Sequence, residues 1–165
     1  MKKYILIVDD EKDICLTLSK ILSSKGFSVI IASNSDAAIN EIKNTSIDLI
    51  LLDVWLEGSK KNGLELLKIM RNYNPDTPVI LISGHANIDI AVKAIKEGAF
   101  YFIEKPFKSE KLFLIINRAL ENAFLKKKYE IYKENLENDE EFIGNTVSIN
   151  NLKKKINQIA NTNTR

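Results

Sequence analysis

Short apolar runs alternate with helix-period segments five times in this chain before residue 121. The runs are the candidate strands, and they cover Tyr4–Val8, Phe27–Ile31, Asp48–Leu52, Pro78–Ile82 and Phe100–Ile103. Several are continuous aliphatic stretches, which are typical of strands buried on both faces of a parallel sheet. Parallel strands joined through helices require right-handed crossovers, so the alternation predicts an α/β domain with a doubly wound, five-stranded parallel sheet.

The segments between the candidate strands carry apolar residues at helical spacing. The four expected helices are Lys12–Ser24, Asp36–Lys43, Gly63–Tyr73 and Asn87–Glu97. Ser35 is expected to cap the second helix at its N-terminus. Gly26, Pro75 and Gly98 follow the first, third and fourth helices, where residues of these types commonly end a helix.

A fifth helix, capped by Ser109, is expected to extend well beyond the sheet, because no Gly or Pro follows before Gly144. Its distal part carries an apolar stripe at spacings of four, three and four: Leu125, Tyr129, Tyr132 and Leu136. The stripe predicts a coiled-coil or partner-helix seam, and the alternative is a solvated linker helix. The amphipathic segment around Leu152 is too short to bury its own apolar face, so it reads as a piece of a larger domain.

Composition excludes several classes of protein. The charges nearly balance, with 24 Lys and Arg against 22 Asp and Glu, so they leave no footprint of nucleic-acid binding. Cys15 is the sole cysteine and is expected to pack in the core, since one thiol forms neither an internal disulfide nor a cysteine metal cage. No apolar run approaches the length of a membrane span, and the N-terminus enters a strand directly. We therefore expect a cytoplasmic protein without a membrane partner.

Polar residues follow four of the apolar runs. They are Asp9 and Asp10, Asp53, Ser83 and Lys105. Because the carboxyl ends of parallel strands meet at one edge of the sheet, these side chains should converge although they are scattered in sequence. Several carboxylates, a hydroxyl and an ammonium suit a hard cation such as Mg²⁺ beside a phosphoryl group.

Each of these residues also has a plainer interpretation. Asp9 and Asp10 could cap the following helix and favour its positive end, and Asp53, Ser83 and Lys105 could be ordinary loop residues. Their joint placement at one sheet edge favours the functional interpretation. The single histidine, His85, is expected to be a loop residue, because no nucleophile, base and orienting group surround it in sequence.

Four segments make the chain similar to the receiver domain of bacterial two-component response regulators. They are ILIVDDE, DLILLDVWL, VILISGHA and AIKEGAFYFIEKPF, and the similarity covers residues 1 to about 123 in register. It is strongest toward the NtrC group, and the long loop DVWLEGSKKNGLELL resembles its NtrX branch. Most receivers have a shorter loop with a proline here, so the wall of the site near Trp55 departs from the common pattern. The implied fold is a flavodoxin-like (βα)5 receiver with strand order 2-1-3-4-5 and an extended fifth helix.

The resemblance also implies a domain organisation. Residues 1–122 would form the receiver domain, and residues 123–141 a helical linker or coiled coil. Residues 142–165 are similar to the start of an AAA+ domain that acts on sigma-54 RNA polymerase. No G-x-x-x-x-G-K-[ST] nucleotide loop occurs in the 165 residues, so the resemblance implies no ATPase activity for this chain.

The family's site residues carry over to matching positions of this sequence. Asp53 would be the phosphoacceptor, and Mg²⁺ would be held by Asp9, Asp10, Asp53 and the backbone carbonyl of Trp55. Ser83 and Lys105 would bind the phosphoryl group, with Phe102 as the switch aromatic and a cis peptide bond before Pro106.

The implied function is that of a regulatory phosphoacceptor rather than an enzyme, which promotes only its own phosphorylation and dephosphorylation. A sensor histidine kinase would supply the phosphoryl group, and phosphorylation would favour a homodimer. The full-length protein would contact DNA and sigma-54 RNA polymerase, though not through this chain. One rival is an Mg²⁺-dependent phosphotransferase or phosphatase, against which stand the lack of a cap domain and of an acid at Trp55. Another is a degenerate receiver used only for binding, which the complete set of site residues disfavours.

Overall fold

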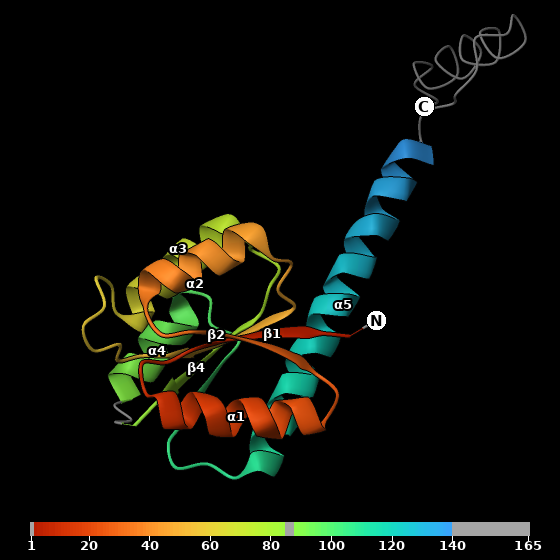
Figure 1. Cartoon of the computed structure of the whole chain (residues 1–165). Helices are drawn as coiled ribbons and strands as arrows, with labels where there is room; N and C mark the ends of the chain where they lie inside the picture. The colour runs from red at the N-terminus through yellow and green to blue at the C-terminus, as the bar shows by residue number, and fades with distance from the viewer. Residues whose placement is uncertain (1, 85–87, 140–165) are drawn as a thin grey trace, which may run out of the picture. The chain divides into compact units, whose positions relative to one another are not determined.

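A computed structural model of the chain describes residues 2–84 and 88–139. Its five strands form one parallel sheet in the order β2-β1-β3-β4-β5 (Figure 1). The strands are β1 (Tyr4–Val8), β2 (Ser28–Ala32), β3 (Leu49–Asp53), β4 (Val79–Ser83) and β5 (Tyr101–Glu104). The predicted doubly wound α/β fold and its strand order are confirmed.

Five helices alternate with these strands. They are α1 (Lys12–Ser24), α2 (Ser35–Asn44), α3 (Gly63–Tyr73), α4 (Ile88–Lys96) and α5 (Ser109–Asp139). The expected cap of α2 was wrong by one residue. Asn34 is the N-cap, and its side-chain oxygen accepts a hydrogen bond of 2.9 Å from the N–H of Ala37. Ser35 is instead the first helical residue, because the longer Asn side chain before it already reaches the free N–H group.

The strands β2 to β5 each begin and end one residue later than the sequence predicted. In β3, β4 and β5 the parallel pairing continues past the last aliphatic residue to the polar residue that follows. Asp53 pairs with Ile82, and Ser83 pairs with Glu104. The sheet itself therefore fixes the backbone of Asp53 and Ser83.

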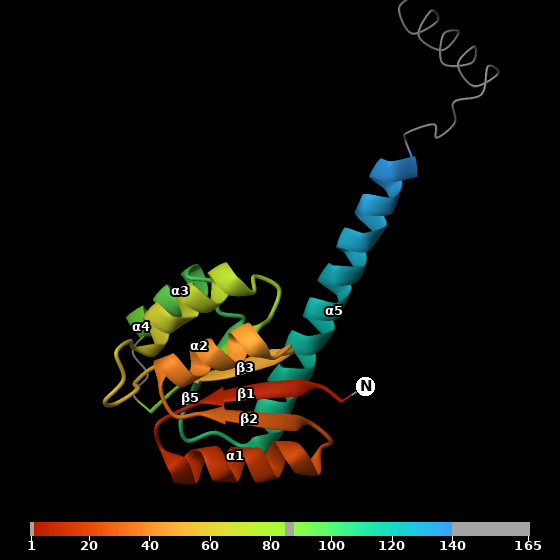
Figure 2. The same cartoon turned by 45° about the horizontal axis from the view of Figure 1, so that its top comes forward.

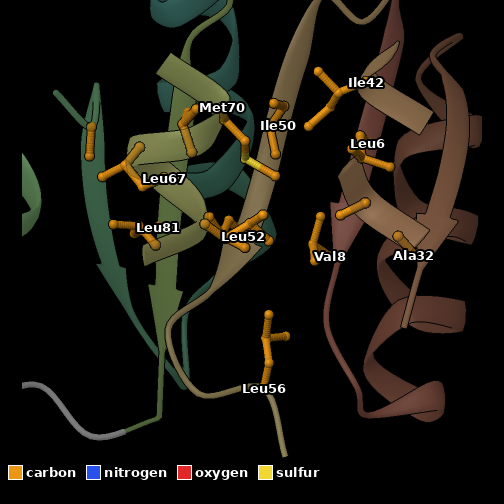
Figure 3. Packing of buried hydrophobic residues seen from close by; sticks show 14 of the residues in the cluster. Leu6, Val8, Ala32, Ile42, Ile50, Leu52, Leu56, Leu67, Met70 and Leu81 are labelled. Atoms are coloured by element: carbon orange, nitrogen blue, oxygen red, sulfur yellow. The ribbon is translucent and has the colours of Figure 1, made fainter. Parts of the chain in front are cut away.

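The sheet is covered on both faces. Helices α2, α3 and α4 pack on one face, and α1 and the first part of α5 pack on the other (Figures 1 and 2). Leu6, Ile50, Leu52 and Leu81 point from the strands toward the helices of the first face, where Met70 meets them (Figure 3). Cys15 is buried in the second cluster, as expected. Burial on both faces explains why these strands read as continuous aliphatic runs.

The chain divides into two units, Met1–Lys126 and Lys127–Arg165. In the second unit the structure describes the helical residues up to Asp139, where Tyr129, Ile131 and Tyr132 are exposed. The side chain of Leu136 and the segment 142–165 lie outside the described residues, as does His85. Within residues 2–84 and 88–139, no helix combines the length and the apolar character that a membrane span requires.

Candidate functional site

Asp53 is the last residue of β3 and is buried at the carboxyl edge of the sheet. One carboxylate oxygen, Oδ2, accepts a hydrogen bond of 2.7 Å from the N–H of Trp55. The other, Oδ1, lies 2.9 Å from the ammonium nitrogen of Lys105. Burial raises the pKa of Asp53, although its contact with Lys105 opposes that effect. The site therefore holds a carboxylate that is poorly hydrated and oriented by two donors.

Asp9 follows β1 and presents a second buried carboxylate beside the first. Its Oδ1 accepts the N–H of Glu11 at 2.9 Å, and its Oδ2 accepts a hydrogen bond from Lys105 at 2.9 Å. The backbone N–H of Asp9 bonds to the carbonyl of Ala32 at 3.2 Å, which ties this loop to β2. Asp10 is more exposed and lines the adjoining cavity.

Lys105 connects these carboxylates. Its side chain is 16% exposed, and its Nζ lies 2.9 Å from Asp9, 2.9 Å from Asp53 and 3.6 Å from Glu11. Burial acts to lower its pKa, but hydrogen bonds to the two aspartates outweigh burial, so the pKa is raised. The backbone N–H of Lys105 donates to the carbonyl of Ser83 at 2.7 Å, and the peptide bond to Pro106 is cis. Lys105 is therefore held at the site by both its backbone and its charge.

Ser83 and Phe102 are the two predicted switch residues on the strands β4 and β5. Ser83 is fully buried at the end of β4. Phe102 is half-buried on β5 opposite Leu81, and it packs against the cluster under α2, α3 and α4. Neither Ser83 nor Phe102 lines the cavity beside the carboxylates.

An open cavity adjoins the charged residues at this edge. Its lining comes from the end of β3, from the segments that follow β1, β3, β4 and β5, and from the first turn of α4: Asp10, Glu11, Asp53, Trp55, Leu56, Glu57, Asn62, Gly84, Ile90 and Lys105. Trp55 is 52% exposed, whereas its neighbour Leu56 is buried. The cavity gives Asp53 access to a small ligand from outside.

The carboxylates fit a hard cation by their chemistry, because oxygen donors on an acidic edge are the ligands that Mg²⁺ takes. In the part of the chain that the structure describes, however, no three Asp, Glu, His or Cys side chains are grouped as a metal site. The ammonium of Lys105 contacts both Asp9 and Asp53 and offsets part of their combined negative charge. A cation bound by both aspartates would therefore compete with Lys105 for their oxygens.

Gly63 is a further residue of the site, and sequence reasoning had treated it only as a helix start. A Cβ atom added here would lie 2.1 Å from the backbone oxygen of Asp53, a distance no side chain can adopt. The N–H of Gly63 donates to the carbonyl of Val54 at 2.9 Å. Asn62 and Glu65 cap α3 reciprocally, and this Asn-x-x-Glu spacing was the signal in the sequence. The start of α3 thus packs directly on the backbone of Asp53.

Comparison with known proteins agrees with this geometry. The model of the response regulator receiver domain family matches residues 5–117. The nitrogen assimilation regulatory protein NtrX of Azorhizobium caulinodans is 43% identical over 165 residues, which are 100% of this chain and 36% of that protein. The regulatory protein AtoC of Escherichia coli is 37% identical over 123 residues, 74% of this chain and 26% of AtoC. The chain thus spans 36% or less of the length of these relatives.

Solved structures give the same result. The receiver domain of NtrX from Brucella abortus is 47% identical with a TM-score of 0.69, and the match covers 71% of this chain and 98% of that one. The beryllofluoride-activated receiver domain dimer of NtrC4 is 39% identical, also with a TM-score of 0.69, over 73% of this chain and 98% of that one. The chain therefore belongs to the response regulator receiver family and is a receiver domain of the NtrX and NtrC type.

Proposed function

We propose that this chain is a phosphorylation switch in which Asp53 accepts a phosphoryl group from a sensor histidine kinase. The contact of Lys105 with both Asp9 and Asp53 carries this proposal, because it places a cation beside a buried carboxylate that opens onto a cavity. An oxygen of Asp53 would attack the phosphorus atom of the donor, and the leaving group would keep the electron pair of the broken bond. Lys105 would then neutralise charge on the phosphoryl oxygens.

Mg²⁺ is a general requirement of receiver domains, and Asp9, Asp10, Asp53 and the carbonyl of Trp55 would hold it here. The ion would supply charge neutralisation and orientation for in-line transfer. Lys105 would release Asp9 and Asp53 to the cation while staying at the same sheet edge, because its backbone is bonded to Ser83. Burial raises the pKa of Asp53, which favours this exchange because a poorly hydrated carboxylate gains much from a cation.

Ser83 and Phe102 would couple the phosphate to the surface. The hydroxyl of Ser83 would donate to the aspartyl phosphate, and Phe102 would turn inward into the space that Ser83 leaves. Ser83 is paired with Glu104 and Phe102 with Leu81, so movement of the end of β4 reaches β5 through two adjacent strands. The phosphate would thereby bias two arrangements of the α4 and β5 region.

An apolar surface on α4 and β5 suits dimerisation of the phosphorylated form. Ile88, Val92 and Ile95 lie four and three residues apart on one side of α4, and all three are exposed. Tyr101 on β5 is also exposed. Residues 123–141 would act as a helical linker that adds to this interface, and residues 142–165 would begin the sigma-54 AAA+ domain. The full-length protein would contact DNA and sigma-54 RNA polymerase through other domains.

Phosphorylation is tested by incubating the chain with acetyl phosphate, with and without Mg²⁺, and measuring the intact mass. We expect one phosphoryl group, only with Mg²⁺, and none in Asp53→Asn, because an amide oxygen is a poor nucleophile. Asp36→Asn is the matched control, since Asp36 is an exposed acid of α2. A phosphoryl group retained in Asp53→Asn would identify another acceptor and contradict the proposal.

Dimerisation is tested by sedimentation velocity with and without beryllofluoride, a mimic of the phosphoryl group. We expect a tighter dimer with the mimic, and its loss in Ile95→Lys but not in Leu16→Lys, which changes an exposed residue of α1. Removing residues after 122 should weaken the dimer and leave its dependence on the mimic. A monomer under all conditions would exclude the dimer, and a constant dimer lost only on truncation would place control in the helix.

A further inference from the structure

The long loop between β3 and α3 contains a tight turn of four residues, Leu56 to Ser59. The N–H of Ser59 donates to the carbonyl of Leu56 at 3.3 Å. Gly58 has a φ of +66°, the left-handed conformation that the third position of such a turn requires. The turn is therefore a defined structure and orients the side chain of Ser59.

Ser59 joins this turn to the start of α2. Its Oγ accepts a hydrogen bond of 2.8 Å from the backbone N–H of Ser35, the first residue of that helix. The first N–H groups of a helix have no partner within the helix, so Ser59 caps α2 from a different segment of the chain. Ser35 is 1% exposed, and its own hydroxyl has no hydrogen-bond partner in the described structure. Without Ser59, the backbone N–H and the hydroxyl of Ser35 would both be buried without a hydrogen-bond partner.

The same loop forms the outer wall of the cavity. Trp55 and Glu57 line the cavity together with Lys105 and Asp10. Leu56 lies between them in sequence and points into the core cluster beyond Leu52 and Val8 (Figure 3). The loop is thus held by apolar packing at Leu56 and by a hydrogen bond at Ser59, and Glu57 lies between these two residues in the sequence.

We propose that Ser59 is a positioning residue that holds Trp55 and Glu57 over the cavity and so limits the access of water to phosphorylated Asp53. The role rests on the proposed function, because it concerns the lifetime of the phosphoaspartate. In hydrolysis a water oxygen bonds to phosphorus while the bond from phosphorus to Asp53 breaks. The carboxylate leaves with the electron pair, and inorganic phosphate and a proton go to solvent. An indole and a carboxylate held over the cavity would reduce the positions from which water can attack.

The test compares the full chain with four variants, using two measurements. Ser59→Ala removes the acceptor for Ser35, and Ser59→Thr keeps a hydroxyl. Gly58→Ala strains the same turn from its backbone, since its φ is unfavourable to alanine although its Cβ would meet no atom within 4 Å. Ser46→Ala is the control, at an exposed serine in the α2–β3 loop. The measurements are acrylamide quenching of Trp55, the sole tryptophan, and the half-life of the phosphoaspartate in Mg²⁺.

We expect Ser59→Ala and Gly58→Ala to raise the quenching constant of Trp55 by about twofold and to shorten the half-life by about threefold or more, as burial of unsatisfied groups loosens the turn. Ser59→Thr and Ser46→Ala should keep wild-type values. Unchanged quenching and half-life in both turn variants, with the fold intact by circular dichroism, would overturn the role of Ser59. A wild-type chain that takes up no phosphoryl group would contradict the proposed function, whereas quenching would still report whether Ser59 anchors the loop.

Discussion

Lys105 and Arg71 are both partly buried cations, but they lie at different places in the fold and bond to different kinds of partner. Lys105 faces the carboxylates of Asp9 and Asp53 at the carboxyl edge of the sheet. Arg71, near the end of α3, donates from Nε and Nη2 to the carbonyl of Gly98 at 2.9 and 2.7 Å. Its Nη1 donates to the carbonyls of Pro75 at 2.5 Å and Thr77 at 3.2 Å.

The difference in partners separates a changeable contact from a fixed one. Burial lowers the pKa of Arg71 and the charge of Asp76 opposes it, whereas the aspartates raise the pKa of Lys105. Backbone carbonyls are neither phosphorylated nor protonated near neutral pH, so we expect the contacts of Arg71 to join α3 to the turn after α4 in every state of the site. A carboxylate can undergo both changes, and in the proposed function the carboxylates beside Lys105 also bind a cation. We therefore expect Arg71 to serve stability and Lys105 to serve the switch.

The largest loss of stability is expected from Arg71→Ala. The substitution leaves three carbonyls without their donors and removes packing, which should cost about 2–4 kcal/mol of unfolding free energy. Arg71→Lys should lose less than Arg71→Ala, because it keeps an aliphatic stem and a donor, but it should not reach wild-type stability, because one ammonium cannot replace the planar fork that reaches three carbonyls. Urea denaturation measures both, with the exposed Arg118→Ala as control. Wild-type stability in Arg71→Ala, or loss of phosphorylation in a fully folded variant, would remove the contrast with Lys105.

Lys105→Met should destabilise the chain less, by about 1–2 kcal/mol at pH 7, because water from the cavity can hydrate the carboxylates and because burial raises the pKa of Asp53, which eases its protonation. The contribution of Lys105 is present below its ordinary pKa of 10.5 and is lost only above it, so between pH 5 and 8 the carboxylates alone set the pH dependence. The loss should shrink toward pH 5, and Mg²⁺ should stabilise the variant more than the wild type. Thermal unfolding with and without Mg²⁺ measures this. An equal Mg²⁺ effect on both proteins would mean that Lys105 and the cation do not compete.

The sequence contains enough information for the fold and for the edge at which the site lies. Strands such as Val79–Ser83 are continuous aliphatic runs, and Asp53, Ser83 and Lys105 are recognisable because each ends or follows a strand. The network around Arg71 could not be predicted, because its acceptors are carbonyls, which every residue carries. The roles of Gly63 and Ser59 could not be predicted for a related reason. They depend on which backbone groups the tertiary fold brings close to them, and the local sequence does not indicate those contacts.

Asp53→Asn should stabilise the fold at pH 7, by about 2–4 °C in Tm. Burial raises the pKa of Asp53 above its ordinary value of 3.8, so the folded state binds the proton more tightly than the unfolded state. The contribution of Asp53 to the stability of the wild type is therefore fully present below pH 3.8, and it is lost as the pH rises through the raised pKa. The advantage of the amide should shrink as the pH falls toward 4. A variant less stable than the wild type at pH 7 would mean that the contact with Lys105 outweighs burial.

The smallest effect is expected from Lys126→Ala, at an ion pair that resembles the Lys105 pairs in distance but not in burial. Lys126 lies 2.7 Å from Asp76, and the two side chains are 51% and 53% exposed. Water and salt screen such a pair, so its loss should cost about 0–1 kcal/mol and less at high ionic strength. Asp76→Asn should cost slightly more, because its charge also favours ionised Arg71. Urea denaturation of both single variants and the double variant, at low and high salt, gives the coupling energy. A coupling energy as large as the loss in Arg71→Ala would show that exposure does not decide which cations stabilise this receiver. It would also show that the loop of Asp76 couples α5 energetically to the rest of the fold.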